Sequence, residues 1–203
     1  MFSGIIQAQS KIIKSTPARE SLRIDIARPS SFKDLQIGDS ISTNGVCLTV
    51  EKLSTKTIRF CLGSETLKVL SKQFVFWKKY PLNLEQSLQF GSRVHGHLVT
   101  GHVDAISKVL KSYRQGDCWQ MELEVPTAIQ KYFWKKGSVC LNGVSLTVNE
   151  VKRNKVGCRI EVCLIPETIQ STNLAQYKPG DFVNIEADYL AKAYIESRGK
   201  EAL

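Results

Sequence analysis

The stretch Asn-Gly-Val-Cys-Leu-Thr-Val at residues 44–50 decides how this sequence folds, because it recurs as Asn-Gly-Val-Ser-Leu-Thr-Val at residues 142–148. The second copy begins 98 positions after the first, close to half of the 203-residue chain. A repeat with this period predicts one folded module that has been duplicated. The heptads differ only at Cys47 and Ser145, so two related sites could bind similar ligands and treat them differently.

The repeat extends on both sides of the heptad. Residues 4–14 align with residues 101–111, and Cys-Leu-Gly-Ser-Glu-Thr at 61–66 aligns with Cys-Leu-Ile-Pro-Glu-Thr at 163–168. Three blocks in the same order are difficult to obtain by chance. Two modules of about 90 to 100 residues each lie within the usual size range of domains. The predicted boundaries are a first domain at 1–95, a second domain at 96–188 and a C-terminal segment at 189–203.

Alternation of apolar and polar residues predicts β-strands in both copies. It is clearest at residues 21–27 and 120–125, and a period of two is typical of half-buried strands. The Asn-Gly pairs at 44–45 and 142–143 predict tight hairpin turns. Further strands are predicted at 40–42, 57–61, 138–141, 158–163 and 181–186. About six short strands per copy favour a small closed barrel, which leaves no exposed sheet edge.

Helices are predicted in three places. Residues 30–35 and 126–132 occupy equivalent positions in the two copies and look like short helices. Residues 189–197 have apolar residues at helical spacing and no counterpart in the first copy, so we expect a C-terminal helix that docks on a neighbouring subunit. The predicted fold class is all-β, with two tandem homologous six-stranded Greek-key β-barrels followed by one α-helix.

The composition excludes several classes of protein. The net charge of +9 suggests nucleic acid as a partner, but the basic residues are scattered and accompany no nucleic-acid motif, which favours a solvated basic surface. No apolar run is long enough to span a membrane, and Lys11 and Lys14 exclude a secretory signal near the start. The prediction is a cytoplasmic protein with neither nucleic acid nor membrane as a partner.

The cysteines do not form a metal-binding pattern. There are six of them, with no Cys-x-x-Cys pair and no Cys/His spacing typical of zinc. Without a secretion signal they are predicted to be reduced thiols, most of them small buried apolar residues. His95 and His97 could share a metal, but no third ligand is suggested nearby. No metal site is predicted.

Six motifs together carry a resemblance to a known family. Besides the two hairpins, they are Met-Phe-Ser-Gly-Ile at 1–5, Gly-His-Leu-Val-Thr-Gly-His-Val-Asp at 96–104, Ile-Pro-Glu-Thr at 165–168 and Gly-Asp-Phe-Val-Asn-Ile-Glu at 180–186. Each motif alone is weak, but in this order they are highly specific. Over nearly its whole length the chain resembles the riboflavin synthase family of the two-barrel type.

The resemblance implies a reaction between two identical substrates. Two molecules of 6,7-dimethyl-8-ribityllumazine react, and one donates a four-carbon unit to the other, giving riboflavin and a ribitylamino-pyrimidinedione. Family members use no cofactor and are homotrimers, with the site between the first barrel of one subunit and the second barrel of the next. The family also suggests lumazine synthase as a partner. Holding two reactants together can supply a large part of the rate.

The resemblance, together with the repeat, implies catalytic residues. Cys47 could act as a nucleophile or assist proton transfer, or it could be simple packing. Ser145 is predicted to pair with Asp188 near the second pocket, although Asp188 could instead only cap the following helix. His97 and His102 are candidate proton carriers, because a histidine pKa lies near neutrality; the alternative is a turn histidine with a satisfied hydrogen bond.

Substrate contacts are expected from the repeated hairpins, from the glycine-led segments near residues 4 and 101, and from the runs at 61–66 and 163–168. Hydroxyls and backbone amides suit the edges of a planar heterocycle. In the family a lysine at the position of Lys136 reaches into the adjacent subunit's site, although an ordinary surface lysine is nearly as good an interpretation. The predicted contact set is Gly4, Ile5, Ile6, Ser40, Cys47, Leu48, Thr49, Cys61, Leu62, Gly63, Ser64, Glu65, Thr66, Gly101, His102, Val103, Lys136, Ser145, Leu146, Thr147, Cys163, Leu164, Ile165, Pro166, Glu167 and Thr168.

One segment departs from the family pattern, and two other functions compete. Residues 67–81 of the first copy lack the Gly-Asp turn of the second, and only Leu-Asn-Leu-Glu at 82–85 survives. The family pattern therefore does not predict how the rim of the first pocket is built. This departure weakly favours a non-catalytic lumazine-binding antenna on the same scaffold. A basic barrel that binds nucleic acid is the third interpretation. The residues at 47, 102 and 145 favour the enzyme.

Overall fold

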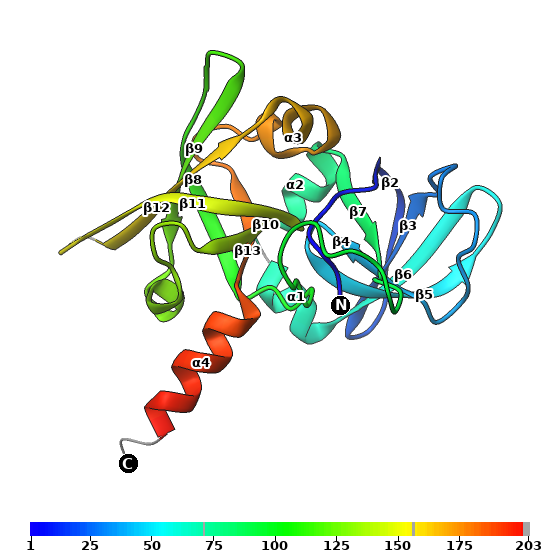
Figure 1. Cartoon of the computed structure of the whole chain (residues 1–203). Helices are drawn as coiled ribbons and strands as arrows, with labels where there is room; N and C mark the ends of the chain where they lie inside the picture. The colour runs from blue at the N-terminus through cyan, green and yellow to red at the C-terminus, as the bar shows by residue number, and fades with distance from the viewer. Residues whose placement is uncertain (71, 156, 201–203) are drawn as a thin grey trace.

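A computed structural model describes residues 1–70, 72–155 and 157–200 of the chain. It is mostly β, with two sheets that lie side by side and one helix projecting from the second (Figure 1). The strands are β1 Ala8–Ser10, β2 Ile12–Pro17, β3 Ser21–Ala27, β4 Ser40–Thr43, β5 Val46–Leu53, β6 Thr57–Gly63, β7 Leu82–Gln86, β8 Ala105–Gln115, β9 Cys118–Val125, β10 Ser138–Leu141, β11 Val144–Asn154, β12 Gly157–Leu164 and β13 Phe182–Ala187. The helices are α1 Ser64–Leu70, α2 Phe74–Lys79, α3 Pro166–Ser171, α4 Tyr189–Lys200 and the 3-10 turns η1 Thr127–Tyr132 and η2 Leu174–Gln176.

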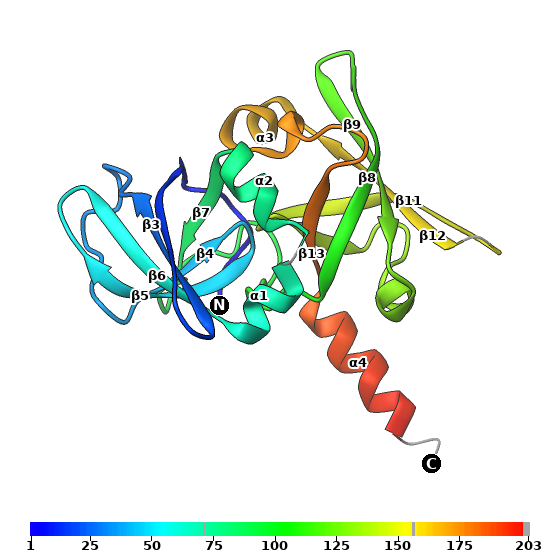
Figure 2. The same cartoon turned by 180° about the vertical axis from the view of Figure 1, so that it is seen from behind.

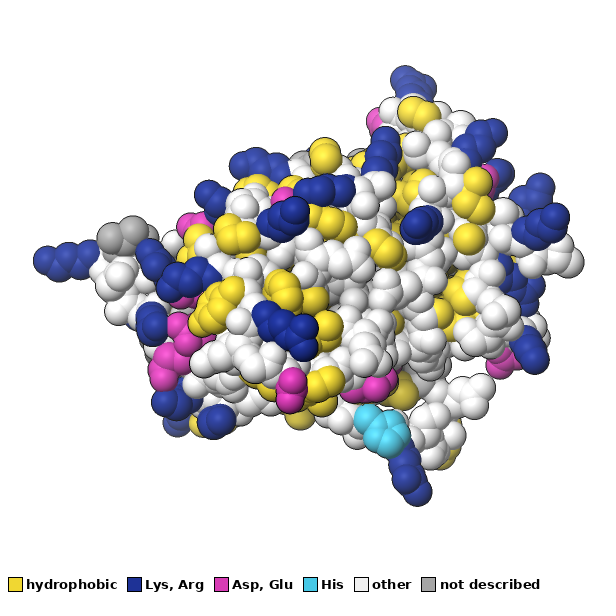
Figure 3. Space-filling model, turned by 90° about the horizontal axis from the view of Figure 1, so that it is seen from above, with side chains coloured by type: hydrophobic (Ala, Val, Ile, Leu, Met, Phe, Trp, Pro, Cys, Tyr) yellow, Lys and Arg dark blue, Asp and Glu magenta, His cyan; other side chains and the backbone are white. Residues whose placement is uncertain are grey.

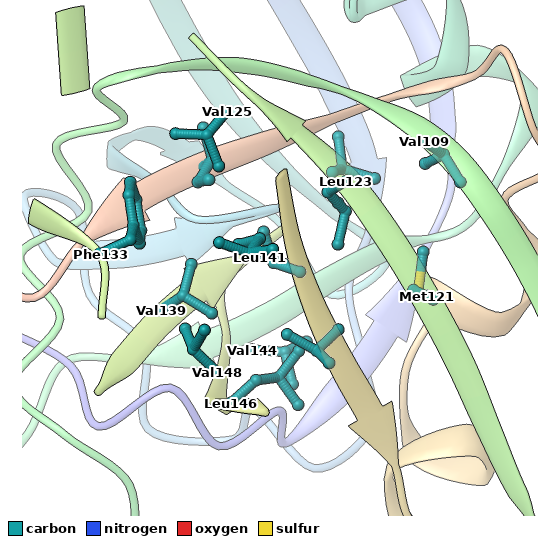
Figure 4. Close-up of a cluster of buried hydrophobic side chains, with 14 of the residues drawn as sticks. Val109, Met121, Leu123, Val125, Phe133, Val139, Leu141, Val144, Leu146 and Val148 are labelled. Carbon is teal, nitrogen blue, oxygen red and sulfur yellow. The ribbon is translucent and has the colours of Figure 1, made fainter. Parts of the chain in front are cut away.

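The second half forms the closed six-stranded barrel that the sequence predicts, in the order β10-β11-β12-β9-β8-β13. Strand β8 closes it because one long strand pairs with β13 at its start and with β9 beyond Val109. Alternate residues of these strands fill the interior, as Figure 4 shows for Leu123, Leu141 and Leu146. Burying about twenty apolar side chains of this kind is the main force that holds the barrel together.

The first half is not a closed barrel, and that part of the prediction is wrong. It is a seven-stranded sheet in the order β1-β7-β4-β5-β6-β3-β2. The segment equivalent to β8 is broken at Lys11, so β1 pairs only with β7 and β2 only with β3. In the second half the equivalent residue, Lys108, lies inside the continuous strand β8. Both halves have a register shift just beyond this point, between Ile12 and Lys14 in the first and between Val109 and Lys111 in the second. The first half therefore lacks a single closing strand, and the covalent chain at Lys11 links its two edge strands, β1 and β2.

The two Asn-Gly turns hold the halves together. Asn44 and Gly45 have φ values of 47° and 81°, and Asn142 and Gly143 have 45° and 83°. These left-handed conformations suit two-residue hairpins, as predicted. The turns lie directly against each other, because a Cβ added to Gly45 would come 2.7 Å from the backbone nitrogen of Gly143. Glycine is required here by the contact as well as by φ.

Buried asparagines cross-link the halves around these turns. The backbone N–H of Asn83 donates to Asn44 Oδ1 at 2.8 Å within the first half, and Asn184 N–H donates to Asn142 Oδ1 at 2.8 Å within the second. Each strand asparagine then crosses over. Asn83 Nδ2 donates to the carbonyl of Asn142 at 3.0 Å, and Asn184 Nδ2 donates to that of Asn44 at 2.8 Å. The relative orientation of the two halves is therefore set by hydrogen bonds in a buried, low-dielectric region.

Residues 67–81, which depart from the repeat, form parts of helices α1 and α2. These two helices lie between the sheets in both views (Figures 1 and 2). Trp77 of α2 is buried in the core of the first half, while Phe76 packs against the core of the second. Phe76 lies 6.1 Å from Tyr177 between ring centroids and 6.3 Å from Phe182. Helix α2 of the divergent segment thus packs against the cores of both halves.

The other predicted helices have mixed outcomes. Residues 30–35 form turns, so the predicted helix there is wrong, whereas 127–132 form a 3-10 helix. The C-terminal helix is confirmed as α4, anchored to the barrel by Ile195. In the described part of the chain, no helix combines the length and apolarity that crossing a membrane requires.

Two expectations from composition concern the basic surface and the burial of the cysteines. Lysine and arginine side chains are spread over the face shown in Figure 3, with acidic groups among them and no single basic stripe. All six cysteines are free thiols, as expected. Only Cys140 and Cys158 are buried, however, so the expectation that most cysteines are core residues is wrong.

Candidate functional site

A cavity of about 270 Å³ opens beside the first repeated hairpin. One wall is Cys47 on β5, and a second is α1, which contributes Glu65 and Thr66. The third wall is the segment Gly101-His102-Val103, which begins the second half of the chain. Because α1 also supplies Val69 and Leu70, the divergent stretch builds part of the pocket wall.

Each half lends a segment to the other half's hairpin. The backbone N–H of Cys47 donates to the carbonyl of Gly101 at 2.9 Å, and that of Ser145 donates to the carbonyl of Gly4 at 2.8 Å. We call residues 3–6 and 100–103 the exchanged arms. Beyond the glycines, Val103 packs on the core of the first half and Ile6 on that of the second. The arms therefore cross between the halves.

The glycines of the arms are required by close approach. A Cβ on Gly101 would come 2.6 Å from Cys47 Cβ, and a Cβ on Gly4 would come 2.6 Å from Ser145 Cβ. Both glycines also have positive φ values, 80° and 76°. The arrangement places His102, exposed, at the Cys47 pocket. Sequence reasoning named both arms but gave no sign that they are exchanged.

The second site contains a hydrogen-bonded Ser–His pair. Ser145 Oγ lies 2.7 Å from His97 Nδ1, and a Cβ on Gly96 would come 2.7 Å from the same oxygen. Burial lowers the pKa of His97, and the negative charge of Asp188 partly opposes this shift. The ring is therefore held neutral near pH 7, and its Nε2 has no hydrogen-bond partner within the described residues.

Asp188 does not bond to Ser145, the pairing that was predicted; it caps a helix. Its Oδ1 accepts the backbone N–H groups of Leu190 at 2.9 Å and Ala191 at 3.2 Å, at the start of α4. The capping interpretation left open by the sequence is therefore the one observed. Asp188 still acts on the site electrostatically through His97, so the group that Ser145 contacts is the histidine.

The predicted contact residues divide by the side of the strand on which they lie. Thr49 and Thr147 are exposed on the outer face of the hairpins, as are Cys61 and Gly63 on β6. Leu48, Leu62, Leu146 and Leu164 point into the cores. The side chains of these four leucines pack in the cores, so their backbone groups are the parts available to a ligand. Strand alternation separates the two groups.

Around the second hairpin the remaining predicted residues follow the same pattern. Ile165, Pro166 and Glu167 are exposed at the start of α3, and Cys163 and Thr168 are half-buried. Ser64, the remaining residue of the first run, is exposed at the start of α1. Of these positions, Glu167 and Thr168 correspond through the repeat to Glu65 and Thr66, which line the Cys47 cavity.

Three predicted or considered polar residues lie apart from the Cys47 cavity. Ser40 and His95 line a separate polar hollow of about 860 Å³ beneath residues 87–95. Lys136 is exposed and has a φ of 69°, an uncommon left-handed value for a non-glycine residue. Its backbone N–H donates to Val148 O at 2.7 Å, as Gly38 does to Val50 O in the first half. Lysine thus occupies a position for which glycine is better suited.

Sequence reasoning missed two buried carboxylates, Glu85 on β7 and Glu186 on β13. Each accepts hydrogen bonds from an exchanged arm. A signal was available, because both end a repeated Asn-x-Glu run at the close of each half, in Leu-Asn-Leu-Glu at 82–85 and Val-Asn-Ile-Glu at 183–186. As for metals, no three His, Cys, Asp or Glu residues gather into a ligand set in the described ranges.

Comparison with known proteins agrees with this duplicated site. The sequence matches the lumazine binding domain family over residues 3–86 and again over residues 100–188. The fold and site therefore define a protein of the lumazine-binding class, with two copies of the domain in one chain.

Curated relatives narrow this class. The chain is 39% identical over 198 residues to riboflavin synthase of Photobacterium phosphoreum, covering 97% of this chain and 88% of the relative. It is 37% identical to the enzyme of Photobacterium leiognathi, with the same coverage, and 37% identical over 203 residues to that of Buchnera aphidicola, covering 97% and 92%. The chain belongs to the riboflavin synthase family and is an enzyme.

Solved structures support the architecture. LumP complexed with 6,7-dimethyl-8-(1'-D-ribityl)lumazine superposes with a TM-score of 0.78 at 22% identity, covering 92% of this chain and 99% of LumP. LumP complexed with riboflavin gives a TM-score of 0.79 at the same identity and coverage. At this identity the similarity shows the fold alone, whereas the full-length relatives identify the enzyme family.

Proposed function

We propose that this enzyme transfers a four-carbon unit between two molecules of 6,7-dimethyl-8-ribityllumazine, one held at each repeated hairpin, and so forms riboflavin. The observation that carries the proposal is the duplicated site, with Cys47 and His102 at one hairpin and Ser145 and His97 at the other. Two pockets of common ancestry suit two identical substrates. Their different side chains suit a reaction in which one molecule donates and the other accepts.

At the first pocket, Cys47 and His102 are the reactive groups. Both line the cavity, and the backbone of Cys47 is fixed by Gly101. Thr49 lies on the same outer face of β5, two residues along the strand. We assign His102 to proton transfer, because an exposed imidazole can exchange protons with bound substrate near neutral pH. Cys47 is assigned to attack or to proton relay.

At the second pocket, His97 and Ser145 form the proton-transfer pair. A neutral imidazole can accept a proton through the serine hydroxyl, and its lowered pKa keeps it in the accepting form. The chemistry requires such a base, because a methyl proton must leave one lumazine before carbon–carbon bond formation. Asp188 then favours the charged imidazole once the proton has arrived, through its coulombic effect on His97.

A homotrimer with sites shared between subunits is part of the proposal. The Cys47 cavity, at about 270 Å³, is slightly below the usual range of ligand pockets, about 300–1,000 Å³. A wall from a neighbouring subunit would complete it. Helix α4 supports association because Tyr189, Leu190 and Tyr194 are exposed on it. Lys136, exposed in its turn, is proposed to reach the neighbour's site.

Association with lumazine synthase and a cytoplasmic location are proposals that rest on the sequence and the family resemblance. So are the domain boundaries at residues 95 and 188, which lie close to the matched ranges 3–86 and 100–188.

The test is to mix the purified protein with 6,7-dimethyl-8-ribityllumazine, without any added cofactor, and to follow flavin absorbance. One riboflavin formed per two lumazines consumed is the expected result. Tight lumazine binding without turnover would contradict the proposed reaction and favour an antenna function. A requirement for a metal or a redox cofactor would contradict the cofactor-free mechanism.

A further inference from the structure

The carboxylate of Glu85 binds the first exchanged arm. The residue lies on β7 and is 2% exposed. Its Oε1 accepts the backbone N–H of Ser3 at 2.7 Å and the Ser3 hydroxyl at 2.9 Å, and its Oε2 accepts the N–H of Gly4 at 3.0 Å. All three donors belong to the segment that continues to the Ser145 hairpin.

Glu186 repeats this arrangement in the other half. It lies on β13 and is also 2% exposed. Its Oε1 accepts the backbone N–H and the hydroxyl of Thr100, both at 2.7 Å, and its Oε2 accepts the N–H of Gly101 at 3.1 Å. The same five-atom pattern occurs twice, with serine exchanged for threonine. Its retention in both copies indicates a requirement of the duplicated site.

Burying these carboxylates is unfavourable by itself. Burial raises the pKa of both glutamates, while the hydrogen bonds from the arms oppose the shift. Among the described residues neither glutamate forms an ion pair with a lysine, arginine or histidine. The arms therefore provide the compensation, since a buried carboxylate must be hydrogen-bonded to be tolerated. Removing either partner would leave the other unsatisfied.

We propose that Glu85 and Glu186 are positioning residues, each of which acts on the pocket of the opposite half. Glu186, in the second barrel, fixes Gly101 and His102 beside Cys47 of the first half. Glu85, in the first half, fixes Gly4 beside Ser145 of the second. The proposal rests on the assignment of these two sites above, and it adds a crossed dependence that proximity in sequence would not predict.

The substitution that tests this is glutamate to glutamine, because it keeps the side-chain size and removes one acceptor. Every donor facing the carboxylate is an N–H or O–H group, so a glutamine amide would place its own N–H₂ against one of them. The arm should shift at that point. Glu186→Gln and Glu85→Gln serve as matched controls for each other, since each carboxylate accepts the same three kinds of hydrogen bond from its arm.

The readout is the pocket at Cys47, followed by its alkylation with iodoacetamide and peptide mass spectrometry. Added 6,7-dimethyl-8-ribityllumazine should protect Cys47 in the unmodified protein. In Glu186→Gln we expect half-protection to need at least about tenfold more lumazine, a loss of about 1.4 kcal/mol of binding. In Glu85→Gln the protection of Cys47 should not change. A general loss of stability would shift both variants equally.

Conservative variants guard against a failure to fold. Thr100→Val removes one of the three hydrogen bonds to Glu186, and Ser3→Ala removes its counterpart at Glu85. Thr100→Val also removes the hydrogen bond that Thr100 Oγ1 accepts from the backbone N–H of His102 at 3.2 Å. Only Thr100→Val should weaken protection of Cys47, and Glu186→Asp should restore part of what Glu186→Gln loses. Equal effects of the paired variants, or no effect in either, would overturn the crossed assignment.

If Glu85 and Glu186 do not position the arms, the experiments show this separately from a failure of the proposed function. Flavin formation by the unmodified protein tests the reaction. If flavin forms but lumazine never protects Cys47, the site assignment is wrong. The proposal that each glutamate acts on the opposite pocket is then rejected with it. If lumazine protects Cys47 normally in the unmodified protein and the paired variants behave alike, only the positioning role of Glu85 and Glu186 is rejected.

Discussion

At the scale of single residues, the exchange of Cys47 for Ser145 distinguishes two otherwise equivalent positions. Each has its backbone N–H bonded to the carbonyl of an arm glycine. Their surroundings differ, because Ser145 contacts Gly96 and His97 whereas Cys47 borders an open cavity. The side-chain difference therefore accompanies a difference in surroundings, which suits Ser145 to proton transfer with His97 and Cys47 to reaction with substrate in its cavity.

The first prediction concerns Cys47→Ser. The change keeps the size and the backbone hydrogen bond to Gly101, so lumazine should still bind. Turnover should fall by about 100-fold or more, a typical loss when a group active in proton transfer or attack is removed. Steady-state kinetics of flavin formation measure it. Cys118→Ser, half-buried on β9 and outside the predicted contact set, is the control and should be near normal; an equal loss there would argue against a specific role for Cys47.

The second prediction is a pH dependence of stability caused by His97. Its pKa is lowered in the folded state by burial, so below pH 6.5 the unfolded chain binds a proton that the folded chain does not. The free energy of unfolding should therefore fall as pH drops through 6.5, by up to about 1.4 kcal/mol per pH unit, until the folded pKa is reached. His97 contributes no such change above pH 6.5.

Urea unfolding between pH 7.5 and 5 measures this effect, with His97→Gln as the comparison. The difference between the two curves isolates His97 from Glu85 and Glu186, whose raised pKa values favour the folded state at low pH. Removing His97 should flatten the decline. Parallel curves for the two proteins would show that His97 titrates normally.

At the scale of elements, helix α2 explains why a divergent sequence persists in the first half. Trp77 enters one core and Phe76 reaches the other. Tyr80 donates a hydrogen bond to Asp181 at 2.7 Å, and its ring lies 4.6 Å from that of Tyr177. These contacts join the halves at a second place, apart from the hairpin turns. Loss of the family's Gly-Asp turn was therefore accompanied by a gain in packing.

The third prediction is that Phe76→Ala destabilises the protein by about 2–3 kcal/mol, below the range of about 3–5 kcal/mol for a fully buried aromatic residue because the ring is only half-buried. Denaturant unfolding followed by circular dichroism measures it. The loss should come with a broader transition as the halves become less coupled. Val75→Ala, exposed on the same helix, should change stability by less than about 0.5 kcal/mol.

At the scale of the whole molecule, the halves are joined symmetrically and the C-terminal helix breaks that symmetry. The asparagine network, the facing turns and the exchanged arms all occur twice. Helix α4 follows only the second half and projects from it (Figure 1). An element that stands outside an internal symmetry and exposes apolar side chains is suited to contact another copy of the chain.

The fourth prediction concerns α4 and assembly. Leu190→Lys places a charge on the exposed apolar side of the helix and should convert an oligomer of three chains to monomers, as measured by light scattering after gel filtration. Flavin formation should fall with the oligomer if the site lies between subunits. Ile37→Lys, an equally exposed position on a turn of the first half, is the control. A monomeric protein before substitution would contradict the trimer.

Much of this could be predicted from sequence, because the repeat and the strand alternation are local signals. The hairpin at Asn142, the strand at 21–27 and the C-terminal helix are observed where expected. The broken strand at Lys11 could not be predicted, since the aligned segment of the second half, with Lys108 at the equivalent position, is one continuous strand. The helix expected at 30–35 was wrong because local propensity is a weak guide in a short connecting segment.

The sequence by itself determined that two related domains follow each other, that each carries an Asn-Gly hairpin, and that Cys47 and Ser145 distinguish them. Only the tertiary structure decided which arm serves which hairpin and that His97, not Asp188, contacts Ser145. It also assigned roles to Glu85 and Glu186. The physical reason is that hairpins and alternation depend on neighbours in the chain, whereas an exchange of arms depends on which buried donors meet which acceptors once the halves have packed.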